Sequence, residues 1–264
     1  MDIVVCVKRV AEHAEAEFEV DETGKKLRIK GAAYDINEWD DYALEEALRL
    51  KERLGGKVTA ITVGGDETEE VLRKCLAKGA DEAIRVDGEA IEGADAYVIA
   101  KVLKEAIRQL SFDLILTGAQ ASDDSYALVG QLVAEMLDIP YATLVKKLEV
   151  LGEGWIKVHR ELEGGLEEIV ELKTPALLTI QTGINEPRYV SIMGIRRASK
   201  KPLKVIKAEE LGLKREELGE QGSWLRLMNF YIPKVERRAE LIEGPADKAA
   251  QRIIEILKER GLLT

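Results

Sequence analysis

Apolar runs alternate with helical patterns over the first half of the chain, and this alternation constrains the fold more than any other feature. The runs are nearly continuous in Val, Ile, Leu and Ala, as expected for strands buried on both faces, and lie at residues 2–8, 57–63, 82–86 and 113–117. Between and after them, apolar residues recur at helical spacing at residues 37–54, 68–78, 94–110 and 126–137. The order predicts an α/β fold with a doubly wound, mostly parallel sheet.

Three turns are expected at the carboxyl ends of these strands, at residues 8–13, 63–66 and 118–124. In open parallel sheets, ligands bind beyond the carboxyl ends of the strands, where the strand order reverses. We therefore expect the three turns to meet at one site. The pattern G-x-G-x-x-G is missing after the first strand, which argues against a standard Rossmann dinucleotide site.

The turn after the strand at 113–117 has the composition of an anion site. Gly118 ends the strand, and Gly118 and Ala119 leave room for a ligand against the backbone. Ser122, Asp123 and Asp124 are natural N-cap residues for the helix that follows, whose first N–H groups could face an anion. The alternative is an ordinary strand-to-helix turn with a good cap. Asn37 is expected to cap its own helix in the same way.

The second half has a different pattern. Residues 143–173 alternate apolar and polar side chains and turn at 152–154 and 164–165, which predicts an antiparallel meander. A hairpin is predicted earlier, at 16–30, and another strand at 175–181. Residues 188–204 are basic, residues 213–232 are irregular and expose Trp224, Phe230 and Tyr231, and residues 245–260 form an amphipathic helix.

Composition narrows the function. The net charge of −10 disfavours nucleic acid or anionic lipid as a partner, and no apolar run approaches the roughly 20 residues of a membrane span. Cys6 and Cys75 lie in apolar patterns, and the chain starts directly as a strand, so we expect a reducing, cytoplasmic location without a leader. His13 and His159 are the only histidines, and metal-ligand spacing, a nucleophile elbow and a P-loop are all missing. A carrier or binding protein without catalytic residues or a metal is favoured over an enzyme.

Several motifs carry a family resemblance. Residues 158–165 read VHRELEGG, residues 175–179 PALLT, residues 185–189 NEPRY and residues 198–201 ASKK. In this order and spacing they resemble the signature of the β subunit of electron transfer flavoprotein, and the likeness extends over essentially the whole chain. The resemblance implies an adenine-nucleotide-binding α/β fold of the HUP-like type. It also implies an electron carrier that is not itself an enzyme, paired with an α subunit that holds the redox-active FAD.

The resemblance places an adenine nucleotide in this chain, either AMP or, in electron-bifurcating members, a second FAD that accepts electrons from NADH. Where AMP-binding members read N-Q-T, this chain has Ala127, Leu128 and Val129, and it matches the bifurcating pattern D-G-x-T-x-Q-V-G only in part. AMP is favoured because Asp124 replaces the glycine that would let a diphosphate approach. Backbone N–H groups would bind the phosphate, and a carboxylate would bind the ribose hydroxyls. The implied pocket residues are Cys6, Asn37, Glu38, Trp39, Asp40, Val63, Gly118, Gln120, Ser122, Asp123, Asp124, Ser125, Ala127, Leu128 and Val129.

The resemblance also implies a role for the basic segment at residues 188–204. Residues 188–199 would form a recognition loop for acyl-CoA dehydrogenase-type donors, with Ile192 as its apolar anchor, and electrons would pass on to a quinone-linked or ferredoxin acceptor. The implied contact residues are Arg188, Tyr189, Ile192, Met193, Arg196 and Lys200. A solvated basic loop with Ile192 and Met193 packed beneath it is the alternative.

The expected division of the chain is a nucleotide-binding domain at 1–228 and a C-terminal arm at 229–264 that contacts the α subunit. A stand-alone ATP-binding domain of similar fold is disfavoured. Lys8-Arg9-Val10-Ala11 stands where such enzymes have a Ser-Gly-Gly-type phosphate loop.

Overall fold

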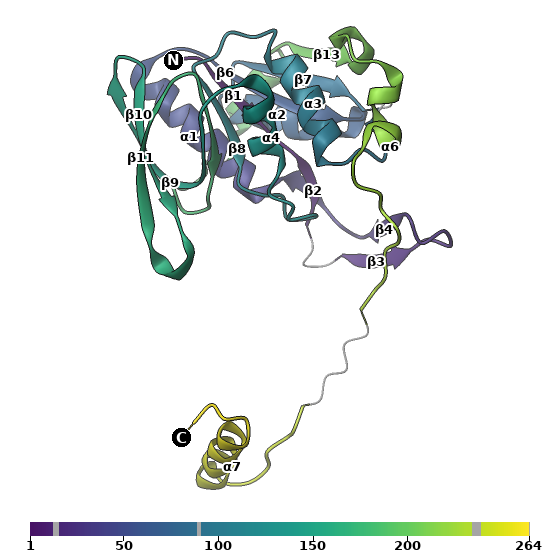
Figure 1. The fold of residues 1–264 in the computed structure, drawn as a ribbon, viewed down its shortest axis with the longest axis vertical. Coiled ribbons are helices and arrows are strands. Elements are labelled where there is room, and N and C mark those ends of the chain that lie inside the picture. Colours follow the sequence, from purple (N-terminus) through teal and green to yellow (C-terminus); the bar gives the residue numbers. More distant parts are fainter. Residues whose placement is uncertain (13–15, 89–90, 234–238, 264) are drawn as a thin grey trace.

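The computed structural model describes residues 1–12, 16–88, 91–233 and 239–263. Its centre is a nine-stranded sheet in the order β11-β10-β9-β12-β8-β1-β6-β7-β13 (Figure 1). The strands predicted in the first half form the middle of the sheet and run parallel: β1 (Ile3–Cys6), β6 (Val58–Gly64), β7 (Glu82–Asp87) and β8 (Leu114–Gly118). The predicted doubly wound α/β fold is confirmed.

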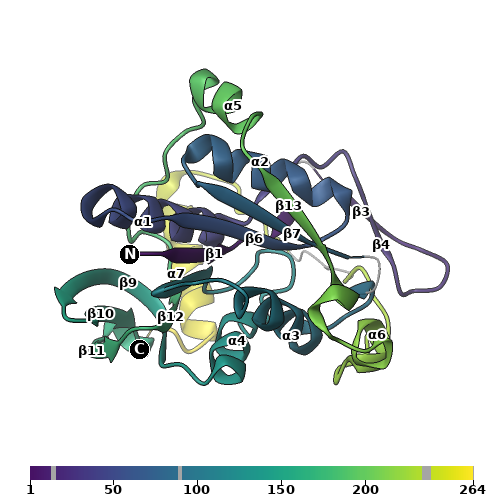
Figure 2. The ribbon, with the colours of Figure 1, turned by 90° about the horizontal axis from the view of Figure 1, so that it is seen from above.

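Helices cover both faces of this sheet, as Figure 2 shows. The pairs are α1 (Glu38–Leu54) with α2 (Glu69–Lys78) on one face and α3 (Ala96–Ile107) with α4 (Val129–Leu137) on the other. Successive residues of β1 serve opposite faces, because Ile3 and Val5 join the core under α1 and α2 while Val4 and Cys6 join the core under α3 and α4. A strand with two buried faces has no polar side, which explains its continuous apolar sequence.

The predicted meander is confirmed, and it extends the same sheet at one edge. Its strands are β9 (Tyr141–Gly152), β10 (Trp155–Glu161) and β11 (Glu167–Lys173), and the predicted β12 (Ala176–Ile180) is inserted parallel between β8 and β9. The opposite edge is β13 (Leu203–Lys207), which the sequence did not predict. In β13 only Ile206 is buried. As an edge strand, β13 exposes most of its other residues, which explains its polar, basic sequence.

Short elements complete the body. The predicted hairpin is confirmed as β3 (Glu17–Val20) and β4 (Leu27–Lys30), and a second small pair joins β2 (Arg9–Ala11) to β5 (Tyr34–Ile36). Short helices that lie wholly within the described residues are η1 (Asp66–Thr68), η3 (Glu163–Gly165), α5 (Ile192–Ala198), η4 (Ala208–Leu211), η5 (Arg215–Glu217) and α6 (Gly219–Gly222).

The predicted terminal helix is α7 (Ala246–Glu259), and Figure 1 shows it apart from the sheet. None of its residues is buried. The division into a domain at 1–228 and an arm at 229–264 stays a prediction. Among the described helices, none combines the length and the apolar character that crossing a lipid bilayer requires.

Candidate functional site

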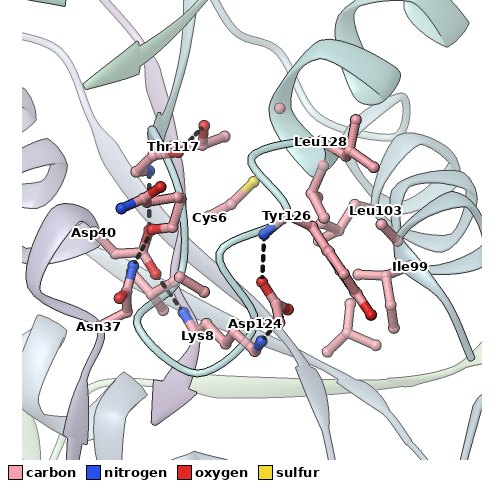
Figure 3. A pocket seen from close by; sticks show the side chains of 18 of the residues that line it. Cys6, Lys8, Asn37, Asp40, Ile99, Leu103, Thr117, Asp124, Tyr126 and Leu128 are labelled. Carbon is pink, nitrogen blue, oxygen red and sulfur yellow. Dashed lines mark hydrogen bonds and ion pairs between the residues drawn. The ribbon is translucent and has the colours of Figure 1, made fainter. Parts of the chain in front are cut away.

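A cavity of about 310 Å³ opens at the carboxyl ends of β1, β6 and β8 (Figure 3). Lys8 follows β1, Val63 is the second-last residue of β6 and Gly118 ends β8, and all three line the cavity. The three predicted turns therefore meet at the cavity, through Lys8 of the first, Val63 of the second and residues 118–121 and 124 of the third. His13, which we expected near this edge, lies outside the described residues.

Most of the expected pocket residues line this cavity. Those that do are Cys6, Asn37, Asp40, Val63, Gly118, Gln120, Asp124, Ala127, Leu128 and Val129. Glu38, Trp39, Ser122, Asp123 and Ser125 are not among the lining residues. Sequence reasoning missed the wall contributed by the start of α3, which includes Asp95, Ile99 and Leu103. The helical spacing of Ile99 and Leu103 is the only signal for this wall, and it indicates a buried face without saying what that face adjoins.

Asp40 joins the first turn of α1 to the ends of β1 and β8. Its Oδ2 accepts a hydrogen bond from the backbone N of Lys8 at 2.8 Å, and its Oδ1 accepts one from the backbone N of Gly118 at 2.9 Å. A Cβ on Gly118 would lie 2.4 Å from Asp40 Oδ1 and 2.7 Å from Trp39 Cβ. Glycine is thus required there because α1 packs against β8. That Gly118 also makes room for a ligand stays a prediction.

The side chain of Asn37 bonds the loop between β8 and α4 instead of capping α1. Its side chain makes no cap hydrogen bond. The amide Nδ2 donates to the carbonyl of Gln120 at 2.8 Å, and Oδ1 accepts from the backbone N of Ser122 at 3.1 Å. Asn37 is the N-cap residue of α1 as predicted, but its side chain does not cap the helix, because partly buried loop groups 83 and 85 residues away in the chain bond both ends of the amide.

Lys8 holds the two aspartates of that loop. Its Nζ lies 2.6 Å from Asp123 Oδ1 and 2.7 Å from Asp124 Oδ2. Burial lowers the pKa of Lys8, but the two carboxylates outweigh it and raise that pKa above its ordinary value. The cation removes much of the repulsion that paired carboxylates would exert on an anionic ligand.

The predicted helix caps at Ser122, Asp123 and Asp124 were wrong. The N-cap of α4 is Leu128, without a side-chain hydrogen bond, and Asp124 Oδ1 accepts instead from the backbone N of Tyr126 at 3.0 Å. Both aspartates pair with Lys8, and the helix starts after them, at Val129.

The start of α4 supplies backbone donors to the cavity. Val129 and Gly130 line it, and the first turn of a helix leaves its N–H groups without intrahelical partners. Ala127, just before the turn, has a positive φ of 51°, a conformation that turns successive N–H groups toward one side. Donors of this kind suit a phosphate.

Another wall of the cavity is apolar. Ile99, Leu103, Tyr126 and Leu128 surround a space that suits a flat aromatic ring (Figure 3). Burial raises the pKa of the Cys6 thiol, which therefore stays protonated and unreactive. Among the described residues, no group of three or more His, Cys, Asp or Glu side chains could hold a metal ion.

Stability is expected to depend on pH through Asp40. Burial raises the pKa of Asp40 to about 7, against the opposing hydrogen bonds from Lys8 and Gly118, whereas an unfolded aspartate titrates near ~3.9. Between these values the folded chain binds more protons, so the contribution of Asp40 is fully present below about pH 4 and is lost as the pH rises through 7. Urea unfolding at several pH values should show this loss in the parent and not in Asp40→Asn; parallel curves would contradict it.

The basic segment presents exposed apolar side chains. Ile192 is 77% exposed and Met193 61% exposed, so packing beneath the loop does not describe them. Tyr189, Arg196 and Lys200 are also exposed, and part of the expected loop is the helix α5. Arg188 is engaged within the chain, where its Nε donates to Glu45 Oε2 at 2.8 Å and its Nη1 to Glu52 Oε1 at 2.6 Å.

The segment after α6 is anchored at Asp95. Its Oδ2 accepts hydrogen bonds from the backbone N atoms of Trp224 and Leu225 at 2.8 and 2.9 Å. The ring of Trp224 stacks on Tyr97 with centroids 4.0 Å apart, although its side chain is otherwise largely exposed. Tyr231 is exposed, and Phe230 lies just at the boundary of exposure.

Comparison with known proteins is consistent with these observations. A family model described as "Electron transfer flavoprotein domain" matches residues 27–211. The electron transfer flavoprotein subunit beta of Methylophilus methylotrophus is 42% identical over 98% of this chain and 98% of its own length. That of Thermoanaerobacterium thermosaccharolyticum is 42% identical over the full length of both chains. Subunit CarD of the caffeyl-CoA reductase-Etf complex of Acetobacterium woodii is 34% identical, also over both full lengths.

Proposed function

The chain belongs to the electron transfer flavoprotein β-subunit family, and from this premise we propose that it is the AMP-binding half of a heterodimer. Proteins of this family take part in electron transfer. In the proposed complex an α subunit carries FAD, and this chain binds a nucleotide, walls off one side of the flavin and docks the electron donor. The redox chemistry would come from the flavin, so the residues of this chain bind, orient and shield.

The observation that carries the proposal is the two-sided cavity at the end of β1, β6 and β8. An adenine ring fits the apolar wall at Ile99 and Leu103, and the phosphate fits the N–H groups at the start of α4. Asp124 lines the cavity, and its carboxylate oxygens, already in contact with Lys8 and the backbone N of Tyr126, can each accept a further hydrogen bond from a ribose hydroxyl while the cation limits the net charge. The residues present therefore fit a mononucleotide.

Size and charge favour AMP over a second FAD. The cavity, about 310 Å³, lies at the lower end of ligand pockets, which span about 300–1,000 Å³. FAD would add a second phosphate, a ribityl chain and a three-ring system. Asp123 and Asp124 share the one cation of Lys8, so a net negative charge remains beside the cavity and opposes a further phosphate.

The docking surface is defined as Tyr189, Ile192, Met193, Ile195, Arg196, Arg197 and Lys200, all exposed. An apolar centre ringed by cations suits a partner with an apolar pocket and an acidic rim. We assign it to an acyl-CoA dehydrogenase-type donor, with a quinone-linked or ferredoxin acceptor for the onward transfer. The C-terminal arm at 229–264, with the exposed Tyr231, is assigned to the α subunit, and so is the exposed Trp224 that precedes the arm.

Nucleotide analysis tests the proposal. The chain is co-expressed with its α subunit, the yellow heterodimer is purified, and small molecules released by acid are quantified by chromatography. We expect AMP and FAD in equal amounts. Two FAD per heterodimer without AMP would instead favour the bifurcating assignment, and a colourless single chain without nucleotide would refute both.

A further inference from the structure

The docking surface lies on a segment that is fastened to the body on its inner side. Arg73, which projects from α2, donates from Nη1 to the carbonyl of Ala198 at 3.0 Å and to the carbonyl of Lys201 at 3.0 Å. These two acceptors end α5 and the turn after it. One guanidinium thus joins α2 to two carbonyls at and just after the end of α5, of which that of Ala198 also accepts from the backbone N of Lys201 at 3.1 Å.

The middle of α5 is in backbone contact with α2. A Cβ on Gly194 would lie 2.4 Å from the carbonyl oxygen of Ala77, so this close approach requires glycine. Ser191 fixes the start of the helix, because its Oγ accepts from the backbone N of Gly194 at 3.0 Å. Ala198 is buried beneath the helix, and Lys201 Nζ donates to the carbonyl of Ala80.

The chain leading into α5 is fastened to α1 as well. Asn185 Nδ2 donates to the carbonyl of Tyr42 and to Glu46 Oε2, both at 3.1 Å. Arg188 continues this attachment through Glu45. The exposed Ile192 and Met193 therefore lie between two attached points, on a helix packed against α2, and not on a free loop.

We propose that Arg73 and Gly194 are positioning residues for docking, which hold α5 so that Ile192 and Met193 are already placed for the partner. The inference rests on the proposed docking function and adds the residues that make the surface rigid. A surface ordered in advance loses little conformational entropy on binding, so removing its supports weakens binding without removing a contact. Neither residue is part of the exposed surface itself, because Arg73 is partly buried and Gly194 fully buried.

Steady-state kinetics of the heterodimer with an acyl-CoA dehydrogenase test this. In Arg73→Gln and in Gly194→Ala we expect the KM for the heterodimer to rise about tenfold with kcat unchanged, as ordering several side chains on binding would require. Gly194→Ala changes no charge, so its effect should not depend on salt. The matched control is Arg108→Gln, which removes an equal charge from the C-cap of α3 on the other face and should leave KM within about twofold.

A double-variant cycle separates positioning from a direct contact. If Arg73 acts by presenting Ile192, then Ile192→Ala combined with Arg73→Gln should show a KM close to that of Ile192→Ala alone. Effects that multiply would overturn the inference. A raised KM in Ile192→Ala with normal KM values in Arg73→Gln and Gly194→Ala would overturn the positioning role while leaving the proposed docking surface intact. A normal KM in Ile192→Ala would refute the surface and the inference together.

Limited proteolysis of the heterodimer tests the attachment of α5 without a dehydrogenase. Trypsin cleavage after Arg196, Arg197 or Lys200 requires local opening of α5, so it should be about tenfold faster in both positioning variants than in Arg108→Gln. Equal absorbance of bound flavin in all variants shows that the fold is retained. Unchanged cleavage rates would contradict the attachment that the contacts imply.

Discussion

Replacing Arg188 with alanine is expected to lower the free energy of unfolding by about 2–3 kcal/mol near pH 7. The reason is Glu45, whose side chain is only 5% exposed and receives Arg188 Nε at 2.8 Å and Nη2 at 3.1 Å. Losing one partner of a buried pair typically costs ~3–5 kcal/mol, because a buried charge is left without compensation. Arg49, whose Nε lies 3.0 Å from Glu45 Oε1, remains in the variant and reduces that cost.

The pH dependence of this loss identifies its cause. Burial raises the pKa of Glu45, but hydrogen bonds from Arg188 and Arg49 outweigh it and hold the pKa below its ordinary value. The stabilisation is therefore present above about pH 4.3, the pKa of an unfolded glutamate, and is lost as the pH falls through the folded pKa. Urea unfolding should show a large difference between parent and Arg188→Ala at pH 7 and a smaller one in acid. Glu52→Gln, at the exposed end of Arg188, is the control and should change stability by less than ~1 kcal/mol.

A loss below about 0.5 kcal/mol in Arg188→Ala, the range of ordinary surface substitutions, would show that Glu45 does not depend on this arginine. Adding Glu45→Gln to Arg188→Ala should recover part of the stability, because it removes the uncompensated charge. Recovery of this kind separates the ion pair from simple loss of packing.

Gly118→Ala is expected to weaken AMP binding about a hundredfold and to destabilise the fold by about 1–3 kcal/mol. The new Cβ would lie 2.4 Å from Asp40 Oδ1 and 2.7 Å from Trp39 Cβ, and 3.0 Å from the backbone N of Asp40. Because the backbone of Asp40 cannot move away from the new Cβ by itself, the whole first turn of α1 must shift. That turn carries Asn37, whose hydrogen bonds hold the loop over the cavity. Isothermal titration of nucleotide-stripped heterodimer with AMP measures the effect.

The matched control is Gly65→Ala, at the same edge of the sheet. Its φ is −72°, and a Cβ there would meet mainly the carboxylate end of Glu67, a flexible side chain that can move away. We expect AMP affinity within about twofold of the parent. Parent-like affinity in Gly118→Ala would mean that the position of α1 does not control the cavity.

The sequence predicted the central strands and helices well because burial on both faces gives each strand an unmistakable pattern. It failed where a contact between distant residues decides the local structure. Asn37 and the aspartates at 123–124 have the composition of helix caps, yet one bonds the loop after β8 and the others bond Lys8. Pattern alone could not rank these contacts against a cap, since each joins elements far apart in the chain.

The candidate site, too, could be predicted from the sequence only in part. Residues at the carboxyl ends of β1, β6 and β8 could be placed from the alternation of strands and helices. The wall at Ile99 and Leu103 could not, because the same helical pattern describes any buried face. The family resemblance supplied Arg188 as a docking residue, whereas in the structure its guanidinium is held by Glu45 and Glu52. A basic residue in a basic segment carries no sequence signal of such an internal partner.

Photolabelling with 8-azido-AMP tests most directly whether the cavity is an adenine nucleotide site. The nucleotide-stripped heterodimer is irradiated with the reagent, and labelled peptides are mapped by mass spectrometry with and without excess AMP. We expect AMP-protected labelling in residues 94–103 or 119–130, the walls of the cavity. Labelling elsewhere in the chain, or labelling that excess AMP does not prevent, would contradict the account.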